Sequence, residues 1–195
     1  MILALIGYKR TGKDTLVKIL NREISDFKNW IIFSGGDKFP HYDQWIRLAS
    51  ADSLKNEICK LHSIEYNENN KDKKIIKINS ELYSFRDLCI NYAKNNEDKL
   101  KWVKNVCSIV DCNRSYIITD LRFYHELNYL KSFCNQNNIE FKTARLYDSD
   151  IIDNNLSNQS EHELDSEKTD YLLLRKRSEL SFFEQYYDFG EIGTI

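Results

Sequence analysis

The chain has 195 residues, of which 42% are hydrophobic and 30% charged, and its formal net charge is −2. This length suits one α/β domain with a full core, and the balanced charge gives no general attraction to nucleic acid or to an anionic membrane. We therefore expect a single domain over residues 1–195 that binds neither nucleic acid nor a membrane.

The cysteines and the first apolar run bear on localisation. The five cysteines are scattered and never spaced C-x-x-C, which argues against a disulfide framework or a zinc site. Residues 2–6 are too short and lack the basic leader of a signal peptide, and no apolar stretch approaches the roughly 20 residues of a membrane span. We expect a cytoplasmic protein. The bias toward asparagine, lysine and isoleucine is typical of AT-rich genomes, viral ones included, and a viral protein would occupy the host cytoplasm.

A glycine-framed loop follows the first apolar run. Residues 2–6 predict a buried strand, and residues 13 to about 24 carry apolar side chains at helical spacing. Strand, glycine loop and helix in this order form a phosphate-binding loop, because glycines let backbone N–H groups surround a phosphate chain at the positive end of a helix. We expect this loop to bind a phosphate chain through Gly7, Lys9, Arg10, Thr11, Gly12, Lys13, Asp14 and Thr15.

Asp14 departs from the common form of such loops, in which a Ser or Thr hydroxyl at this position reaches Mg²⁺. A carboxylate suits a helix N-terminus, but it repels polyphosphate unless a magnesium ion or water lies between them. Thr15 is then the nearby hydroxyl. A glycine turn followed by a lysine can also be an ordinary strand-to-helix connection, but the predicted strand and helix on either side favour phosphate binding.

The rest of the chain alternates between strand and helix patterns. Strands are predicted at 30–33, 116–119, 140–147 and 171–174. Helices are predicted at 52–61, at 81–110 as two helices broken near 95–96, at 125–135 and at 180–187. Residues 66–77 read as a surface excursion, and residues 40–45 fit no pattern. The alternation predicts an α/β fold with a mostly parallel central sheet and a ligand at the carboxyl ends of its strands.

Asp120 and Arg122 lie just past the predicted strand at 116–119. At a strand end of such a sheet a carboxylate can hold Mg²⁺ or its waters, while an arginine can bind a phosphate through two hydrogen bonds. The alternative is a local Asp/Arg pair on the surface.

Other candidate ligand residues lie further from the loop. Asp52 can cap a helix that includes Lys55, or it can face a phosphate acceptor. Arg86 on a mostly apolar helix is either a solvated charge or a ligand. Glu161 is a candidate for supporting the site, whereas His162 is left out because phosphoryl transfer needs positioning and charge neutralisation more than proton abstraction.

These segments together resemble the P-loop kinases related to bacteriophage deoxynucleoside monophosphate kinases and animal phosphomevalonate kinase. Residues 7–15 are similar to the pattern G-x-K-x-S-G-K-D-T, including its aspartate, and residues 118–127 to a D-x-R-x-x-x-E-L segment. Weaker blocks look like the family's small-small-x-P-L-K turn, its acceptor-side arginine helix, its W-V-K helix and its S-E-x-x-L…D-Y tail; they lie at 50–55, 85–88, 101–104 and 160–171. The blocks follow the family's order over nearly the whole chain.

The resemblance implies a three-layer P-loop fold like that of nucleoside monophosphate kinases, with ATP as donor, Mg²⁺, and transfer of the γ-phosphoryl group to a small monophosphate. Lys13, with Lys9 and Arg10, would handle the donor phosphates, and Asp14 and Asp120 would organise the metal. The catalytic set would be Lys13, Arg86, Arg122 and Asp120. The acceptor would be bound by Asp52, Lys55, Arg86, Arg122, Arg145 and Glu161, with Arg86 and Arg122 clamping its phosphate.

Three positions depart from the family's pattern. Ser53 replaces a proline, and Asn158 stands where a histidine is frequent. The predicted lid, about 146–159, should bring a cation over the transferring group, yet residues 147–158 hold three aspartates and no lysine or arginine. Because charge-stabilising arginines can be worth 10³–10⁵ in rate, turnover would depend on a substitute such as Arg145.

Three hypotheses follow. The first is a deoxynucleoside monophosphate kinase, the second a catalytically degenerate kinase fold that binds nucleotide or protein, and the third a kinase for a non-nucleotide phosphate such as phosphomevalonate. Aromatic side chains at 39, 42 and 45 can stack a base, which favours nucleotides slightly. The expected partners are small-molecule nucleotides, and a homodimer stays open.

Overall fold

A computed structural model of the chain describes residues 1–24, 30–34, 39–40, 42–148, 162–175 and 192–193. The chain divides into two compact units: the sheet unit, Met1–Leu48 with Val110–Ile195, and the helical unit, Ala49–Ile109. The predicted terminal helix at 180–187 and all of the predicted lid beyond residue 148 lie outside the described residues.

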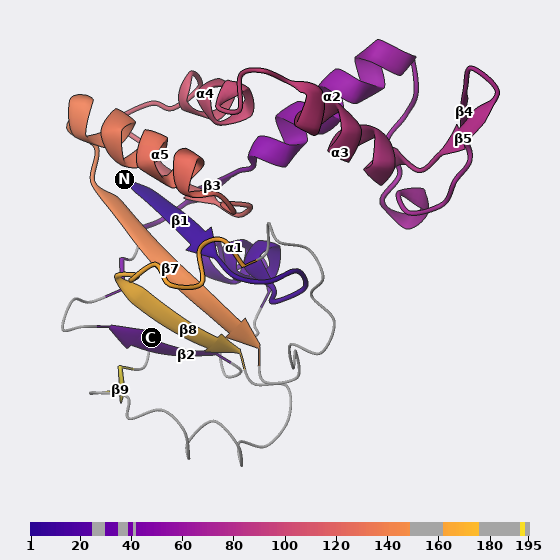
Figure 1. The fold of residues 1–195 in the computed structure, drawn as a ribbon. Helices are drawn as coiled ribbons and strands as arrows, with labels where there is room; N and C mark the ends of the chain where they lie inside the picture. The colour runs from indigo at the N-terminus through magenta and orange to yellow at the C-terminus, as the bar shows by residue number, and fades with distance from the viewer. Residues whose placement is uncertain (25–29, 35–38, 41, 149–161, 176–191, 194–195) are drawn as a thin grey trace. The chain divides into compact units, whose positions relative to one another are not determined.

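The sheet unit is organised around a mostly parallel sheet (Figure 1). Its parallel strands lie in the order β3 (Trp45–Leu48), β6 (Ser115–Ile118), β1 (Ile2–Ile6), β7 (Phe141–Asp148) and β8 (Tyr171–Arg175). Next to β8, β2 (Trp30–Ser34) pairs antiparallel, and β9 (Ile192–Gly193) pairs antiparallel with β2. The first strand therefore lies in the middle of the parallel strands.

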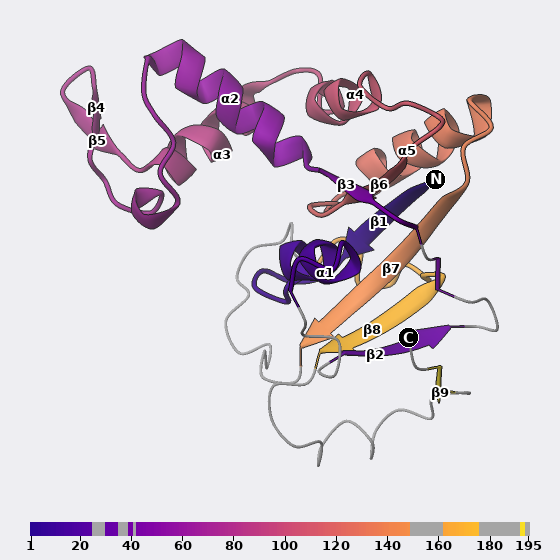
Figure 2. The ribbon, with the colours of Figure 1, turned by 180° about the vertical axis from the view of Figure 1, so that it is seen from behind.

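Helices cover both faces of this sheet. All five residues of β1 are buried, as a strand with packed helices on either side requires. The two helices α1 (Lys13–Leu20) and α5 (Tyr124–Gln136) lie on opposite faces (Figures 1 and 2). On the α1 face the core contains Leu3, Leu5, Leu16, Ile19 and Leu146, and α5 buries Leu127, Leu130 and Cys134. The predicted class, a three-layer α/β fold with a mostly parallel central sheet, is confirmed.

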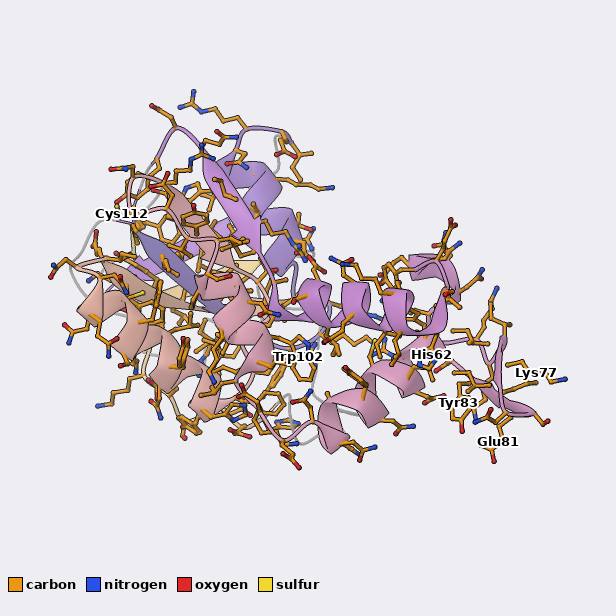
Figure 3. The ribbon with its side chains drawn as sticks, turned by 90° about the horizontal axis from the view of Figure 1, so that it is seen from above. His62, Lys77, Glu81, Tyr83, Trp102 and Cys112 are labelled. Atoms are coloured by element: carbon orange, nitrogen blue, oxygen red, sulfur yellow. The ribbon has the colours of Figure 1, made fainter. Side chains whose placement is uncertain are left out.

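The helical unit contains three helices and a hairpin within the described residues. It runs through α2 (Ser50–His62), a 3₁₀ turn (Glu68–Asn70), β4 (Ile76–Ile78), β5 (Glu81–Tyr83), α3 (Phe85–Asn95) and α4 (Lys101–Cys107). Figure 3 shows Lys77, Glu81 and Tyr83 on the hairpin and Trp102 on α4. Ile58, Phe85 and Leu88 form its buried core, and the Trp102 indole N–H donates to Glu57 at 3.0 Å, which ties α4 to α2.

Two elements of the sheet unit differ from prediction. Strand β3 begins within the stretch 40–45 that fitted no pattern. It was not predicted, because it has only four residues and Arg47 interrupts its apolar run. Helix α1 ends at Leu20 rather than near Ile24. The side chain of Asn21 turns away from the helix to hydrogen-bond the Trp45 backbone, donating to its C=O at 2.9 Å and accepting from its N–H at 2.7 Å.

In the helical unit two predictions were wrong. Helix α2 begins at Ser50, with Ala49 as its N-cap residue, so Asp52 does not cap it. Residues 81–83, predicted as helix, form a strand that pairs with 76–78, part of which was predicted as a surface excursion. Their short alternating pattern fits a hairpin edge as well as a helix turn. The predicted break between two later helices is present between α3 and α4. None of the helices in the described ranges is both long and apolar enough to cross a bilayer.

Candidate functional site

The glycine loop connects β1 to α1 at the carboxyl end of the middle one of the parallel strands. A Cβ on Gly7 would lie 2.8 Å from the carbonyl oxygen of Leu146 on β7 and 3.1 Å from Thr11 Oγ1. Since real Cβ atoms do not approach a backbone oxygen so closely, only glycine fits at this position. Gly12, at φ +90°, is the N-cap residue of α1 and offers no side-chain oxygen to the first turn of that helix. The N–H groups of the first turn are thus directed at the space in front of the loop.

A single hydrogen-bonded turn from Tyr8 to Thr11 stabilises the middle of the loop. The backbone N–H and the hydroxyl of Thr11 both donate to the carbonyl of Tyr8, at 3.3 and 2.9 Å, and Thr11 is buried. Arg10 between them has φ +71°, a conformation that is uncommon outside glycine and often found at functional sites. Lys9 and Arg10 are exposed. The Thr11 side chain, predicted to contact nucleotide, therefore holds the loop together, while the two cations face outward.

The ammonium group of Lys13 lies across the start of the loop. Its Nζ donates to the carbonyl oxygens of Gly7 at 2.6 Å and Tyr8 at 2.8 Å. An ammonium group has three N–H donors and a compact charge, so it can pass from these carbonyls to an anion held at the loop. This is the position at which the sequence predicted a phosphate-binding lysine.

Asp14 forms an ion pair that sequence reasoning missed. Its Oδ1 accepts from Arg47 Nε at 2.5 Å, and Arg47 lies on β3 next to the loop helix. The arginine offsets the repulsion that a carboxylate at this position would exert on polyphosphate. No sequence signal indicated Arg47, because β3 itself was not predicted.

Asp120 and Arg122 follow β6, as predicted, and Glu126 joins them from α5. Oε2 of Glu126 accepts from the backbone N–H groups of Arg122 and Phe123, both at 3.3 Å. Burial, together with the negative charge of Asp120, raises the pKa of the Glu126 carboxyl to about 7. Glu126 therefore fixes the backbone at the strand end that carries the predicted metal and phosphate residues, and it does so near a second carboxylate.

Carboxylate oxygens are the ligands that Mg²⁺ prefers, and magnesium sites in phosphoryl transfer commonly use one or two carboxylates together with substrate phosphates. Asp14 and Asp120 suit such a site by donor chemistry. Within the described ranges, no three or more His, Cys, Asp or Glu side chains gather into a protein-only metal cage. The residues present thus fit a metal that arrives with the nucleotide better than one resident in the protein.

A second cluster binds the loop to the segment before β8. Asp165 Oδ2 accepts from the Tyr8 hydroxyl at 2.8 Å and lies 2.8 Å from His162 Nδ1, and the Tyr8 and His162 rings are 5.3 Å apart. Arg145, on β7, lies 3.8 Å from Asp165 and donates to the carbonyls of Leu164 and, at 3.0 Å, Glu167. Sequence reasoning set His162 aside and missed both Tyr8 and Asp165.

Arg145 was predicted to substitute for a lid cation. Its side chain is 9% exposed, and its contacts hold the turn at 164–167. These contacts explain the residue without a substrate, so its role toward a transferring phosphoryl group stays a prediction. Glu161 and residues 149–159 of the predicted lid lie outside the described residues.

The predicted acceptor residues of the helical unit gather around one aromatic ring. Lys55 Nζ lies 4.7 Å from the centroid of Tyr66, and it pairs with Asp52 at 3.3 Å. Burial, together with the negative charge of Asp52, raises the pKa of the Tyr66 hydroxyl. Arg86 Nε donates to Asp72. Sequence reasoning treated Tyr66 as part of a surface excursion and so missed the residue around which this cluster forms.

The described cysteines are structural or surface residues. Burial raises the pKa of the Cys89 and Cys134 thiols to about 11, so both are neutral, weakly reactive thiols at physiological pH. Each of the five is a free thiol.

Comparisons with known proteins do not reach a family assignment. No known protein family matches the chain, and no curated protein matches its sequence. Among solved structures, a mutant of the APS kinase of Mycobacterium tuberculosis is 9% identical, with a TM-score of 0.38, 74% of this chain covered and 73% of the other. A candidate kinase from Chloroflexus aurantiacus is 11% identical, with a TM-score of 0.39, 76% of this chain covered and 59% of the other. At these scores the likenesses identify neither substrate nor family.

Proposed function

We propose that this chain is a P-loop phosphotransferase that moves the γ-phosphoryl group of ATP to a deoxynucleoside monophosphate, with Mg²⁺ as cofactor. The observation that carries the proposal is the loop after β1, in which Gly7 must lack a Cβ and Lys13 lies across the entrance. A strand, a glycine loop and a helix N-terminus bind phosphate chains through backbone N–H groups, and an adjacent ammonium group adds the charge.

The acceptor side of the proposal rests on charge and on the family resemblance. In the helical unit, Lys55 lies over the ring of Tyr66, and Arg86 directly follows Phe85, whose ring lies 4.9 Å from that of Tyr66. A lysine and an arginine suit the phosphate of a small monophosphate. The motif resemblance favours a deoxynucleotide over other small phosphates, so a non-nucleotide acceptor such as phosphomevalonate is the variant of this proposal to test alongside it.

Catalysis would be electrostatic. Lys13 would bind the donor's outer phosphates, and the acceptor's phosphate would be bound by the arginines that the family resemblance implies, Arg86 and Arg122. Bound Mg²⁺, held by Asp14 and Asp120, would supply positive charge at the transferring oxygens. Arg47 would keep Asp14 from repelling the polyphosphate. No residue needs to remove a proton in the rate-determining step, which agrees with the absence of His162 from the proposed catalytic set.

The test is a Lys13→Ala variant in a coupled assay of ADP release with each of the four deoxynucleoside monophosphates and with phosphomevalonate. We expect transfer to fall at least about 10²-fold, since removing a preorganised charge from a developing oxyanion costs this much or more. Lys18→Ala removes the same charge from the exposed side of the same helix and should retain activity. Unchanged turnover in the Lys13 variant would end the assignment.

A catalytically degenerate module that binds nucleotide is the second candidate. The acidic sequence of residues 147–158 favours it, because that stretch offers no cation to the transferring group. Calorimetry separates the two: ATP binding that Lys13→Ala abolishes, without turnover on any of these acceptors, would support the binding module over the kinase.

A further inference from the structure

Arg86 lies at the start of α3 and is held from one side by the segment 66–72. Its Nε donates to Asp72 Oδ1, and its backbone N–H donates to the carbonyl of Lys71 at 3.0 Å. Both contacts come from adjacent residues of one segment. The backbone hydrogen bond between Arg86 and Lys71 fixes the position of the neighbouring residue Asp72, and so it fixes where the Asp72 carboxylate contacts the guanidinium.

The same segment is anchored at its other end. The Tyr66 hydroxyl and the Lys71 ammonium group both bind Glu68, and the Tyr66 ring lies 4.9 Å from that of Phe85, the first residue of α3. The Lys55 ammonium group lies 4.7 Å from the Tyr66 ring. Asp72 is thus carried by a short stretch of chain that packs on both α2 and α3.

The contact uses only one edge of the guanidinium. Asp72 binds Nε, and in the described part of the chain no hydrogen bond to Nη1 or Nη2 of Arg86 is formed. An arginine presents its N–H groups in a rigid planar fork, so a partner at Nε fixes the plane while the terminal nitrogens remain available for a second, bidentate partner. A phosphate is the natural partner for such a pair of nitrogens.

We propose that Asp72 is a positioning residue for acceptor binding: it orients the guanidinium of Arg86 so that its two terminal nitrogens receive the acceptor's phosphate. This rests on the proposed function, in which Arg86 binds that phosphate. The gain comes from preorganisation. A long side chain that is ordered before the ligand arrives loses less rotamer freedom on binding, by about 0.5–1.5 kcal/mol, which corresponds to a factor of about two to ten in Kd.

A competing interpretation of the same contact predicts the opposite change in acceptor affinity when Asp72 is removed. The pair is exposed, with 37% of the Arg86 side chain and 61% of the Asp72 side chain accessible, and such pairs contribute little stability. If Asp72 only occupied the guanidinium, removing it would free Arg86 and tighten acceptor binding. If Asp72 orients it, removal weakens binding. The direction of the change therefore decides between them.

The experiment is a calorimetric titration of Asp72→Ala with the deoxynucleoside monophosphates and, as a ligand without base or sugar, with inorganic phosphate. We expect the Kd of each to rise about two- to tenfold, and the acceptor KM to rise with kcat and the ATP KM unchanged. Asp72→Asn should restore most of the affinity, because its amide oxygen still accepts from Nε. Glu81→Ala removes the same charge from the hairpin of the same unit and should change nothing (Figure 3).

A double variant shows whether Asp72 acts through Arg86. In an Arg86→Ala background, Asp72→Ala should have no further effect on the Kd. Tighter or unchanged binding in Asp72→Ala overturns the proposal, and so does a full effect that persists without Arg86, or a wild-type chain that binds none of these ligands.

Failure of the proposed function has a different signature from failure of this inference. If inorganic phosphate responds to Asp72 and Arg86 as expected but no acceptor is phosphorylated, the orienting role stands and the kinase assignment falls. If transfer proceeds and Asp72→Ala leaves acceptor binding intact, the kinase assignment stands and the orienting role falls.

Discussion

At the scale of single residues, the glycine loop leaves little conformational freedom to the turn after β1. Gly7 lies against the backbone of β7, so the constraint comes from a strand more than a hundred residues away in the sequence. Thr11 then closes the turn from inside through the carbonyl of Tyr8. The loop is held in shape by its neighbours without a ligand, and the proposed electrostatic catalysis requires such preorganisation.

Gly7→Ala should destabilise the fold. The added Cβ would lie 2.8 Å from the Leu146 carbonyl oxygen, and because that oxygen belongs to a backbone within the sheet, the strands must shift. Overpacking of this kind costs about 1–3 kcal/mol. Urea unfolding followed by circular dichroism measures it, with Ala51→Gly on α2 as a control for the generic effect of glycine exchange. A variant as stable as the wild type would show that β7 does not press on the loop.

At the scale of elements, the short strand β3 depends on a contact from the end of α1. The side-chain amide of Asn21 bonds both the N–H and the C=O of Trp45, replacing the backbone partner that an edge strand lacks on its outer side. Trp45 is buried, and Arg47 two residues later reaches Asp14 of the loop. One asparagine thus contributes to both the sheet edge and the charge balance of the phosphate loop.

Asn21→Ala should cost about 1–3 kcal/mol, the usual penalty for leaving partly buried backbone groups without partners. Asn21→Asp keeps an acceptor for the Trp45 N–H but loses the donor to its C=O, so its loss should be intermediate. Chemical denaturation of the three proteins at one pH gives the order. Equal stability of the alanine and aspartate variants would mean that the N–H contact contributes nothing.

At the scale of the whole molecule, the carboxyl end of β6 couples folding stability to pH. The Glu126 pKa is raised to about 7 from an ordinary value of 4.5, first by burial and then by the charge of Asp120. The folded state therefore binds a proton more tightly than the unfolded state between these two values. This contribution to stability is fully present below about pH 4.5 and is lost as the pH rises through 7.

Glu126→Gln should flatten the pH dependence of the unfolding free energy between about pH 5 and 7, and the variant should be more stable than the wild type above pH 7. Glutamine can still accept from the N–H groups at the start of α5, so the helix cap is retained. Urea titrations at unit pH steps, without magnesium or nucleotide, measure the effect. Asp120→Asn should flatten the slope only in part, and an unaltered slope in the glutamine variant would contradict the assignment.

The sequence predicted most of the sheet unit because its elements are long or uniformly apolar. The strands at 2–6, 115–118 and 171–175 read as mostly apolar runs, the strand at 141–148 is long enough to be recognised despite its charged residues, and α5 has a regular helical pattern. Strand β3 was not predicted, because four residues with an internal arginine show too little periodicity to be recognised as a strand. The β4–β5 hairpin was not predicted either, because strands of three residues are too short to show an alternating hydrophobic pattern.

The sequence by itself determined the glycine loop between β1 and α1, since glycine spacing, an apolar strand and an amphipathic helix are local properties that neighbouring residues carry together. Only the tertiary structure decided which side chains meet across the chain: Arg47 with Asp14, Asp165 with Tyr8, and Asp72 with Arg86. Such pairs join residues from different elements, and strand order and loop paths, rather than any local pattern, bring them within hydrogen-bonding distance.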